Sequence, residues 1–141
     1  MPNQPHSLRI PEPLDAEISR ELRRRGIREW SAGALTLLDE AVRTSRAPGI
    51  VFVDGLGGRR AAVAFSGLEV WEIVATWKEA DERWDELQQA YPELGEPQLR
   101  AAINYYRLYP AEVDERLEVE ASWTPELLAA ELPFTVPRAR R

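Results

Sequence analysis

The first apolar residues of the chain alternate with polar ones. Leu8 and Ile10 fall on one side of an extended segment, and Ser7 and Arg9 fall on the other. This period of two is typical of a strand. A strand this short leaves unpaired N–H and C=O groups along both edges. We therefore expect residues 7–10 to pair with the same segment of a second chain in a homodimer.

Two helices are predicted to follow the strand. Apolar residues recur at a spacing of three to four through residues 14–22 and again through residues 35–42, which is the spacing of one helix face. Gly26 is expected to end the first helix, and Ser31 is expected to cap the second. Such a short segment encloses little core, so we expect it to fold only by pairing.

The next part of the chain has the pattern of a β-hairpin followed by helices. The segment "GIVFVDGLGGRRAAVAF", residues 49–65, contains two β-rich runs around a glycine-rich turn, which predicts the hairpin. Ser66 is expected to cap a helix through Trp77, and further helices are predicted over residues 81–90, 97–109 and 111–120. The predicted fold class is mainly α with a short N-terminal strand and a β-hairpin.

Composition excludes several classes of chemistry. The 141 residues include no cysteine and one histidine, His6. Disulfides, thiolate nucleophiles, Ser-His-Asp triads and zinc sites built from several cysteines or histidines are therefore excluded. No stretch of about 18 apolar residues and no signal-peptide pattern is present. We expect a cytoplasmic protein that is not an enzyme, needs no cofactor or metal, and has no membrane partner.

The net charge of −6 hides an uneven distribution. Residues 1–47 contain eight arginines and seven acids, whereas residues 69–93 contain eight acids and only Lys78 and Arg83 as bases. The N-terminal part is therefore the better candidate for contact with phosphate.

Residues 1–47, from "SLRIP" through the second predicted helix, resemble the ribbon-helix-helix family of bacterial repressors. The resemblance implies an antiparallel ribbon of two strands in the DNA major groove, with Ser7 and Arg9 facing the bases. It also implies phosphate contact at the amino end of the second helix. The implied DNA-binding residues are Ser7, Arg9, Arg28, Trp30, Ser31 and Ala32.

Three features depart from the ribbon-helix-helix pattern. His6 stands where an apolar residue is expected, the turn between the helices is long, and Gly33 lies early in the second helix, where glycine costs about 1 kcal/mol relative to alanine. The alternative interpretation is a dimerisation arm with no role in DNA binding.

Residues 48–117 resemble the small helix-turn-helix domain catalogued as domain of unknown function family 433, which is often found in bacterial antitoxins encoded beside PIN-like ribonucleases. The matching segments are "VWEIVATWK", "AYPELGEPQLRAAINYY" and "YPAEVDE". The third helix of this domain offers a second DNA or protein surface, and the surrounding acids favour protein. Its expected polar face consists of Gln98, Arg100, Asn104, Tyr105 and Arg107.

Residues 118–141 are expected to bind a partner protein. They are acidic, then amphipathic, then basic, a pattern that suits a helix laid into a groove. The candidate residues are Trp123, Leu127, Leu128, Phe134, Arg138, Arg140 and Arg141. The alternative is that the apolar residues pack on this protein's own dimer.

Together these features predict an antitoxin of a type II toxin–antitoxin system, with a ribbon-helix-helix-like element followed by a helix-turn-helix-like domain. It would bind double-stranded operator DNA as a homodimer or higher homo-oligomer and neutralise a PIN-like toxin. The alternative is an oligomeric adaptor that sequesters a protein partner without binding DNA.

Overall fold

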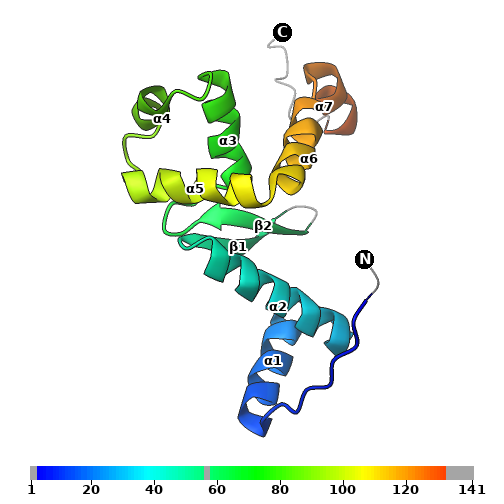
Figure 1. Cartoon of the computed structure of the whole chain (residues 1–141). Helices are drawn as coiled ribbons and strands as arrows, with labels where there is room; N and C mark the ends of the chain where they lie inside the picture. The colour runs from blue at the N-terminus through cyan, green and yellow to red at the C-terminus, as the bar shows by residue number, and fades with distance from the viewer. Residues whose placement is uncertain (1–2, 56–57, 133–141) are drawn as a thin grey trace. The chain divides into compact units, whose positions relative to one another are not determined.

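A computed structural model of the chain describes residues 3–55 and 58–132. These residues form seven helices and one antiparallel hairpin (Figure 1), which confirms a mainly α fold with a β-hairpin. The chain divides into two compact units, Met1–Ser45 and Arg46–Arg141, which we call unit 1 and unit 2. The elements are α1 (Glu12–Arg24), α2 (Trp30–Arg46), β1 (Ile50–Gly55), β2 (Gly58–Val63), α3 (Val70–Glu79), α4 (Trp84–Ala90), α5 (Glu96–Leu108), α6 (Pro110–Ala121) and α7 (Pro125–Glu131).

Helices α1 and α2 form where the sequence predicts them. A proline in the first turn starts α1, where its missing N–H leaves no helix bond unmade. Gly26 ends the helix with φ of +73°, a left-handed conformation that glycine adopts without strain. The predicted cap at Ser31 is wrong by two residues. Because Gly33 N–H donates to the Glu29 carbonyl at 3.0 Å, Glu29 stands at the cap position.

The predicted N-terminal strand is not formed in this single chain. Residues 3–11 have no regular secondary structure, and most of their side chains are exposed. The physical reason is that a single short strand has no neighbouring strand in its own chain with which to form backbone hydrogen bonds. Pairing with a second copy therefore remains a prediction.

Unit 1 contains almost no core. Among its residues 3–45, Leu22 is the one large apolar side chain that is buried, at 3% exposure. Leu22 packs against Gly33, where an added Cβ would lie 2.5 Å from Leu22 Cδ2. Gly33 is therefore explained by the close approach of α1 and α2. The apolar stripe predicted on α2 faces solvent, since Leu35, Leu38 and Val42 are 67%, 52% and 56% exposed.

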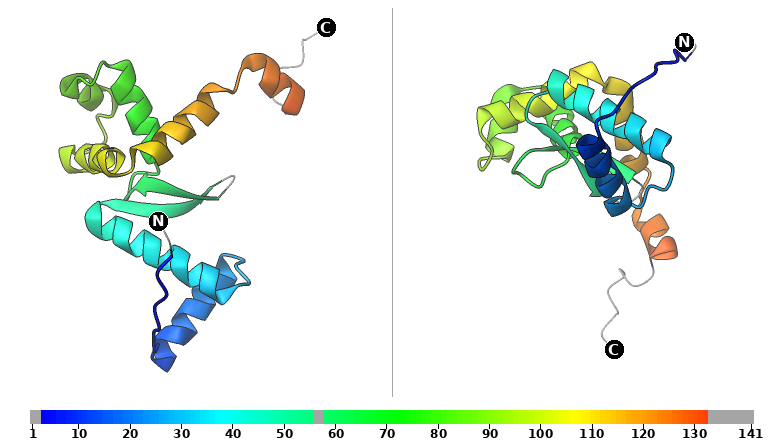
Figure 2. Two further views of the ribbon diagram at one scale, coloured as in Figure 1. Left: turned by 45° about the vertical axis from the view of Figure 1, so that its right-hand side comes forward. Right: turned by 90° about the horizontal axis from the view of Figure 1, so that it is seen from below.

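Unit 2 has a continuous core. Its hairpin pairs Ile50 with Val63 and Phe52 with Ala61, and both strands contact α5. Helix α3 contacts α4, α5 and α6 (Figure 2). Side chains from the hairpin and from these four helices form one buried cluster. The buried residues of this cluster are Ala47, Ile50, Val63, Val70, Ile73, Val74, Trp77, Leu87, Leu99, Ala101, Ala102, Ile103, Tyr105 and Val113.

Two helix starts in unit 2 differ from the prediction. Ser66 does not cap α3, because its hydroxyl closes a turn by donating to the Val63 carbonyl at 2.7 Å. The cap position is taken by Glu69, whose N–H donates to the carboxylate of Glu72 at 2.8 Å. Helix α4 begins at Trp84 rather than at residue 81, because residues 81 and 82 have left-handed φ angles of 50° and 58°.

Within residues 3–55 and 58–132, no helix combines the length and the apolar content that a membrane crossing requires.

Candidate nucleic-acid interface

The two residues predicted to face the bases are accessible. Ser7 and Arg9 are exposed, and Arg9 forms no ion pair with any described residue. Leu8, predicted to face inward, is 70% exposed. The arm therefore has its predicted polar side free, while on its apolar side Leu8 is uncovered and Ile10 is half-buried in the single chain.

The amino end of α2 carries the electrostatic features of a phosphate site. Its first turn contains no acid, and the first N–H groups of any helix have no partner within the helix. Trp30, Ser31 and Ala32, the predicted contacts, are exposed there, as is the preceding Arg28. Arg28 forms no ion pair within the described chain. Glu29 at the cap position acts against anion binding.

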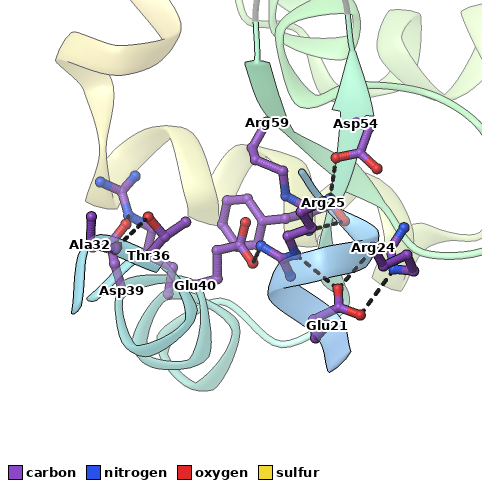
Figure 3. A network of polar contacts seen from close by, with 11 residues as sticks. Glu21, Arg24, Arg25, Ala32, Thr36, Asp39, Glu40, Asp54 and Arg59 are labelled. Atoms are coloured by element: carbon purple, nitrogen blue, oxygen red, sulfur yellow. Dashed lines mark hydrogen bonds and ion pairs between the residues drawn. The ribbon is translucent and has the colours of Figure 1, made fainter. Parts of the chain in front are cut away.

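Two of the three consecutive arginines at the end of α1, Arg24 and Arg25, form ion pairs within unit 1 (Figure 3). Glu21 accepts from Arg24 at 2.7 Å and from Arg25 at 2.8 Å, and Arg25 also donates to Glu40 of α2 at 3.0 Å. Only 9% of the Arg25 side chain is exposed. The hydrogen bonds from Arg24 and then Arg25 lower the pKa of Glu21 to about 2. Arg25 therefore joins α1 to α2 and is largely buried, whereas Arg24 pairs within α1 and keeps 57% of its side chain exposed.

Arg20 and Arg23 remain as further candidates for phosphate contact. Both are exposed and form no ion pair with residues 3–55 or 58–132. Helical spacing distinguishes Arg23 from the two arginines that follow it. Glu21 stands three residues before Arg24 and four before Arg25, which are the spacings that bring side chains together on a helix.

The predicted polar face of α5 is only partly available. Gln98 is engaged, because its Oε1 accepts from Gly95 N–H at 2.9 Å and its Nε2 donates to the Ala64 carbonyl at 3.2 Å. Tyr105 does not belong to this face at all, since it is fully buried and its hydroxyl donates to Glu112. The hairpin covers this side of α5, and the centres of the Phe52 and Tyr105 rings lie 6.3 Å apart in an edge-to-face arrangement. Asn104 donates to the Arg46 carbonyl at 3.5 Å, and Arg100 pairs with Glu96. Arg107 is exposed, and these three residues line one hollow.

The segment predicted to bind a partner forms a short helix, α7. Thr124 caps it by accepting from Leu127 N–H at 3.1 Å. Trp123, Leu127 and Leu128 are 42%, 38% and 37% exposed, so their apolar surfaces are accessible. Helix α6 crosses the predicted start of this segment and ends at Ala121. Phe134, Arg138, Arg140 and Arg141 lie outside the described residues.

No protein-family model, no curated protein and no solved structure matches this chain.

Proposed function

We propose that this chain is a homodimeric DNA-binding antitoxin that regulates its own operon and neutralises a PIN-like ribonuclease. The observation that carries the proposal is the apolar surface of unit 1. Leu8, Leu14, Leu35, Leu38 and Val42 are between 48% and 70% exposed, whereas Leu22 is the one large apolar residue buried among residues 3–45. Five large apolar side chains exposed on a small unit without a core indicate an interface.

A second copy of unit 1 is the partner that suits this surface. Two arms paired antiparallel would satisfy each other's N–H and C=O groups along residues 7–10 and bring Leu8 of each chain under cover. Ser7 and Arg9 would then lie on the outer face of a two-stranded ribbon, which fits the major groove. A symmetric pair would carry two α2 amino ends to the flanking phosphates.

The basic groups of unit 1 support contact with a duplex. Arg9, Arg20, Arg23 and Arg28 form no ion pairs within the described chain, so a dimer offers twice that set of free guanidinium groups. If all of them neutralise phosphates, affinity should fall about ten-thousandfold between about 50 and 200 mM salt.

Toxin binding would belong to α7 and the residues after it. The exposed Trp123, Leu127 and Leu128 give α7 an apolar surface that a groove on a partner can cover. The identification of that partner as a PIN-like nuclease rests on the resemblance of residues 48–117 to antitoxin domains. Arg138 and Arg140 would then reach the carboxylates of the nuclease site.

The decisive experiment measures binding of the full chain to the DNA segment upstream of its own coding sequence, by fluorescence anisotropy over a salt series. Arg9→Ala should lower the preference for this DNA over an unrelated duplex by at least about tenfold, because each guanine contact contributes about 1–3 kcal/mol. Arg83→Ala removes the same charge from unit 2, where Arg83 pairs with Glu86, and should change nothing. An Arg9→Ala protein with unaltered preference would refute the ribbon.

The charge of unit 2 favours a second candidate function, the adaptor that binds only protein. Residues 69–93 carry eight acids against two bases, and such a surface repels DNA. An adaptor would show no DNA binding at any salt concentration, yet would still bind the toxin. In both cases, removal of residues 123–141, which leaves α6 intact, should abolish toxin binding.

A further inference from the structure

A groove of about 610 Å³ lies between α3 and α6 of unit 2. The two helices pack against each other (Figure 1), and the lining residues of each helix are spaced mainly three or four apart. This spacing places them on one helix face. Neither the DNA-binding proposal nor the proposed toxin contact of α7 uses this groove.

The floor of the groove is apolar. Trp71 of α3 and Leu117 of α6 are half-buried and pack against the core of unit 2. Ala75 and Ala121 also line the groove, one from each helix. Alanine at these two positions leaves space that a larger side chain would fill. The groove therefore offers apolar surface to side chains from another segment.

Two of the acids along the groove are already neutralised. Lys78 Nζ lies 3.0 Å from Asp114 Oδ1, so this ion pair joins α3 to α6. Glu120 pairs with Arg116, which stands four residues before it on α6. These two carboxylates have nearby cations and do not require an additional one.

The remaining acids of the groove, Glu79 of α3 and Glu118 of α6, keep their negative charge. Both are exposed, and neither forms an ion pair with residues 3–55 or 58–132. Because they belong to the two helices that form the walls, a cation placed in the groove would be attracted from both sides. The groove therefore suits a segment that contains both apolar and basic residues.

Residues 133–141 of this chain, "PFTVPRARR", have that composition. They contain Phe134, Val136 and three arginines, and they contain no acid. Residues 122–132 place Leu132 at most about 25 Å from Ala121, since seven of them are helical, at about 1.5 Å a residue, and the others extend by at most about 3.4 Å each. The nine residues that follow can span up to about 30 Å, so the arginines can reach the groove.

We propose that residues 133–141 dock in the α3–α6 groove of their own chain. Their guanidinium groups would pair with Glu79 and Glu118, and Phe134 and Val136 would cover the apolar floor. The contact itself requires neither DNA nor toxin. Its consequence rests on the proposed function, because a toxin that binds the same arginines must first displace them from the groove. The groove would then weaken toxin binding by the fraction of chains in which the tail is docked.

A spin label on the tail tests this contact in the full chain. The sequence contains no cysteine, so Ala139→Cys creates a single thiol for a nitroxide. With no DNA or toxin present, the label should broaden the amide resonances of Ala75 and Ala121. Glu79→Gln combined with Glu118→Gln should lower the ratio of docked to undocked tail about fivefold, because two exposed ion pairs are lost.

The matched control is Asp85→Asn combined with Glu93→Gln. It removes the same charge from exposed residues outside the groove and should leave the broadening unchanged. A salt series with the unaltered groove provides a second measurement that needs no carboxylate variant. The contact should weaken towards about 1 M salt, where the Debye length is about 3 Å.

Three results would overturn the proposal. Resonances of the groove that are not broadened would show that the tail lies elsewhere, and equal broadening in the two double variants would remove the carboxylates from the contact. Broadening of an isotope-labelled chain only by a spin-labelled second chain mixed with it would assign the groove to the tail of another copy. Because DNA and toxin are absent from the assay, each of these results leaves the antitoxin proposal standing.

Discussion

Replacement of Leu35 by alanine tests whether a second copy covers unit 1. Leu35 is 67% exposed in the single chain. The substitution removes three carbon atoms, and each carbon buried from water stabilises by about 0.8 kcal/mol. Because about two-thirds of Leu35 is exposed in the single chain, its burial in a dimer would contribute about 1.6 kcal/mol from each copy. A symmetric interface contains the residue twice, so the dimer should lose about 3 kcal/mol, or about a hundredfold in its dissociation constant.

A chain that remains a monomer would show almost no effect of this substitution. An exposed leucine contributes little to a monomer, and alanine is the better helix former, so the free energy of unfolding should change by less than about 0.5 kcal/mol. Sedimentation velocity over a range of protein concentrations separates the two cases. Thr44→Ala is the matched control, because residue 44 lies about 180° around α2 from Leu35 and its side chain is exposed.

A chain that sediments as a monomer at every concentration would refute the reasoning. So would a dimer whose dissociation constant is the same with Leu35→Ala as with Thr44→Ala. Either result would mean that the exposed stripe of α2 is not an interface between copies, and the ribbon of paired arms would lose its physical basis.

Three further perturbations test particular contacts. Gly33→Ala should destabilise the chain in urea unfolding by about 1 kcal/mol despite the better helix propensity, because the new Cβ would meet Leu22 at 2.5 Å. Phe65→Asn should stabilise by up to about 1 kcal/mol in the same assay, since Phe65 is fully exposed with φ of +61°, a conformation that asparagine tolerates better. Glu21, whose pKa is lowered from 4.5 to about 2, should contribute stability above pH 4.5 that is lost as pH falls to about 2. The difference in unfolding between the parent and Glu21→Gln should therefore shrink over that range, and a constant difference would contradict the ion pairs.

The sequence predicted the elements whose signals are local. Gly26 ended the first helix, and the glycine-rich turn marked the hairpin, because left-handed and tight-turn conformations need particular residues wherever they occur. The order of helices and strand pair in unit 2 followed from such signals. The starts of α3 and α4 did not, since Ser66 has the composition of a cap but its hydroxyl serves a turn, and cap residues and turn residues are the same types.

The candidate site was harder to predict, because tertiary packing decides which polar residues remain free. Tyr105 falls beside the polar residues of α5 in sequence, but the hairpin and α6 bury it. Gln98 was expected to contact a partner and instead bonds Gly95 and Ala64. The hollow lined by Arg100, Asn104 and Arg107 also includes Trp77 of α3 and Trp84 of α4, and the periodicity of one helix does not reveal a cavity between several helices.

The different cores of the two units predict that folding and the proposed DNA binding are coupled in unit 1 alone. Unit 2 buries a continuous cluster, so its fold does not require a second chain. Unit 1 buries Leu22 and little else among residues 3–45, and it also carries Arg9 and Arg28. A ligand that binds only the paired form stabilises it in proportion to the logarithm of ligand concentration. Operator DNA should therefore raise the unfolding temperature of unit 1 and leave that of unit 2 unchanged.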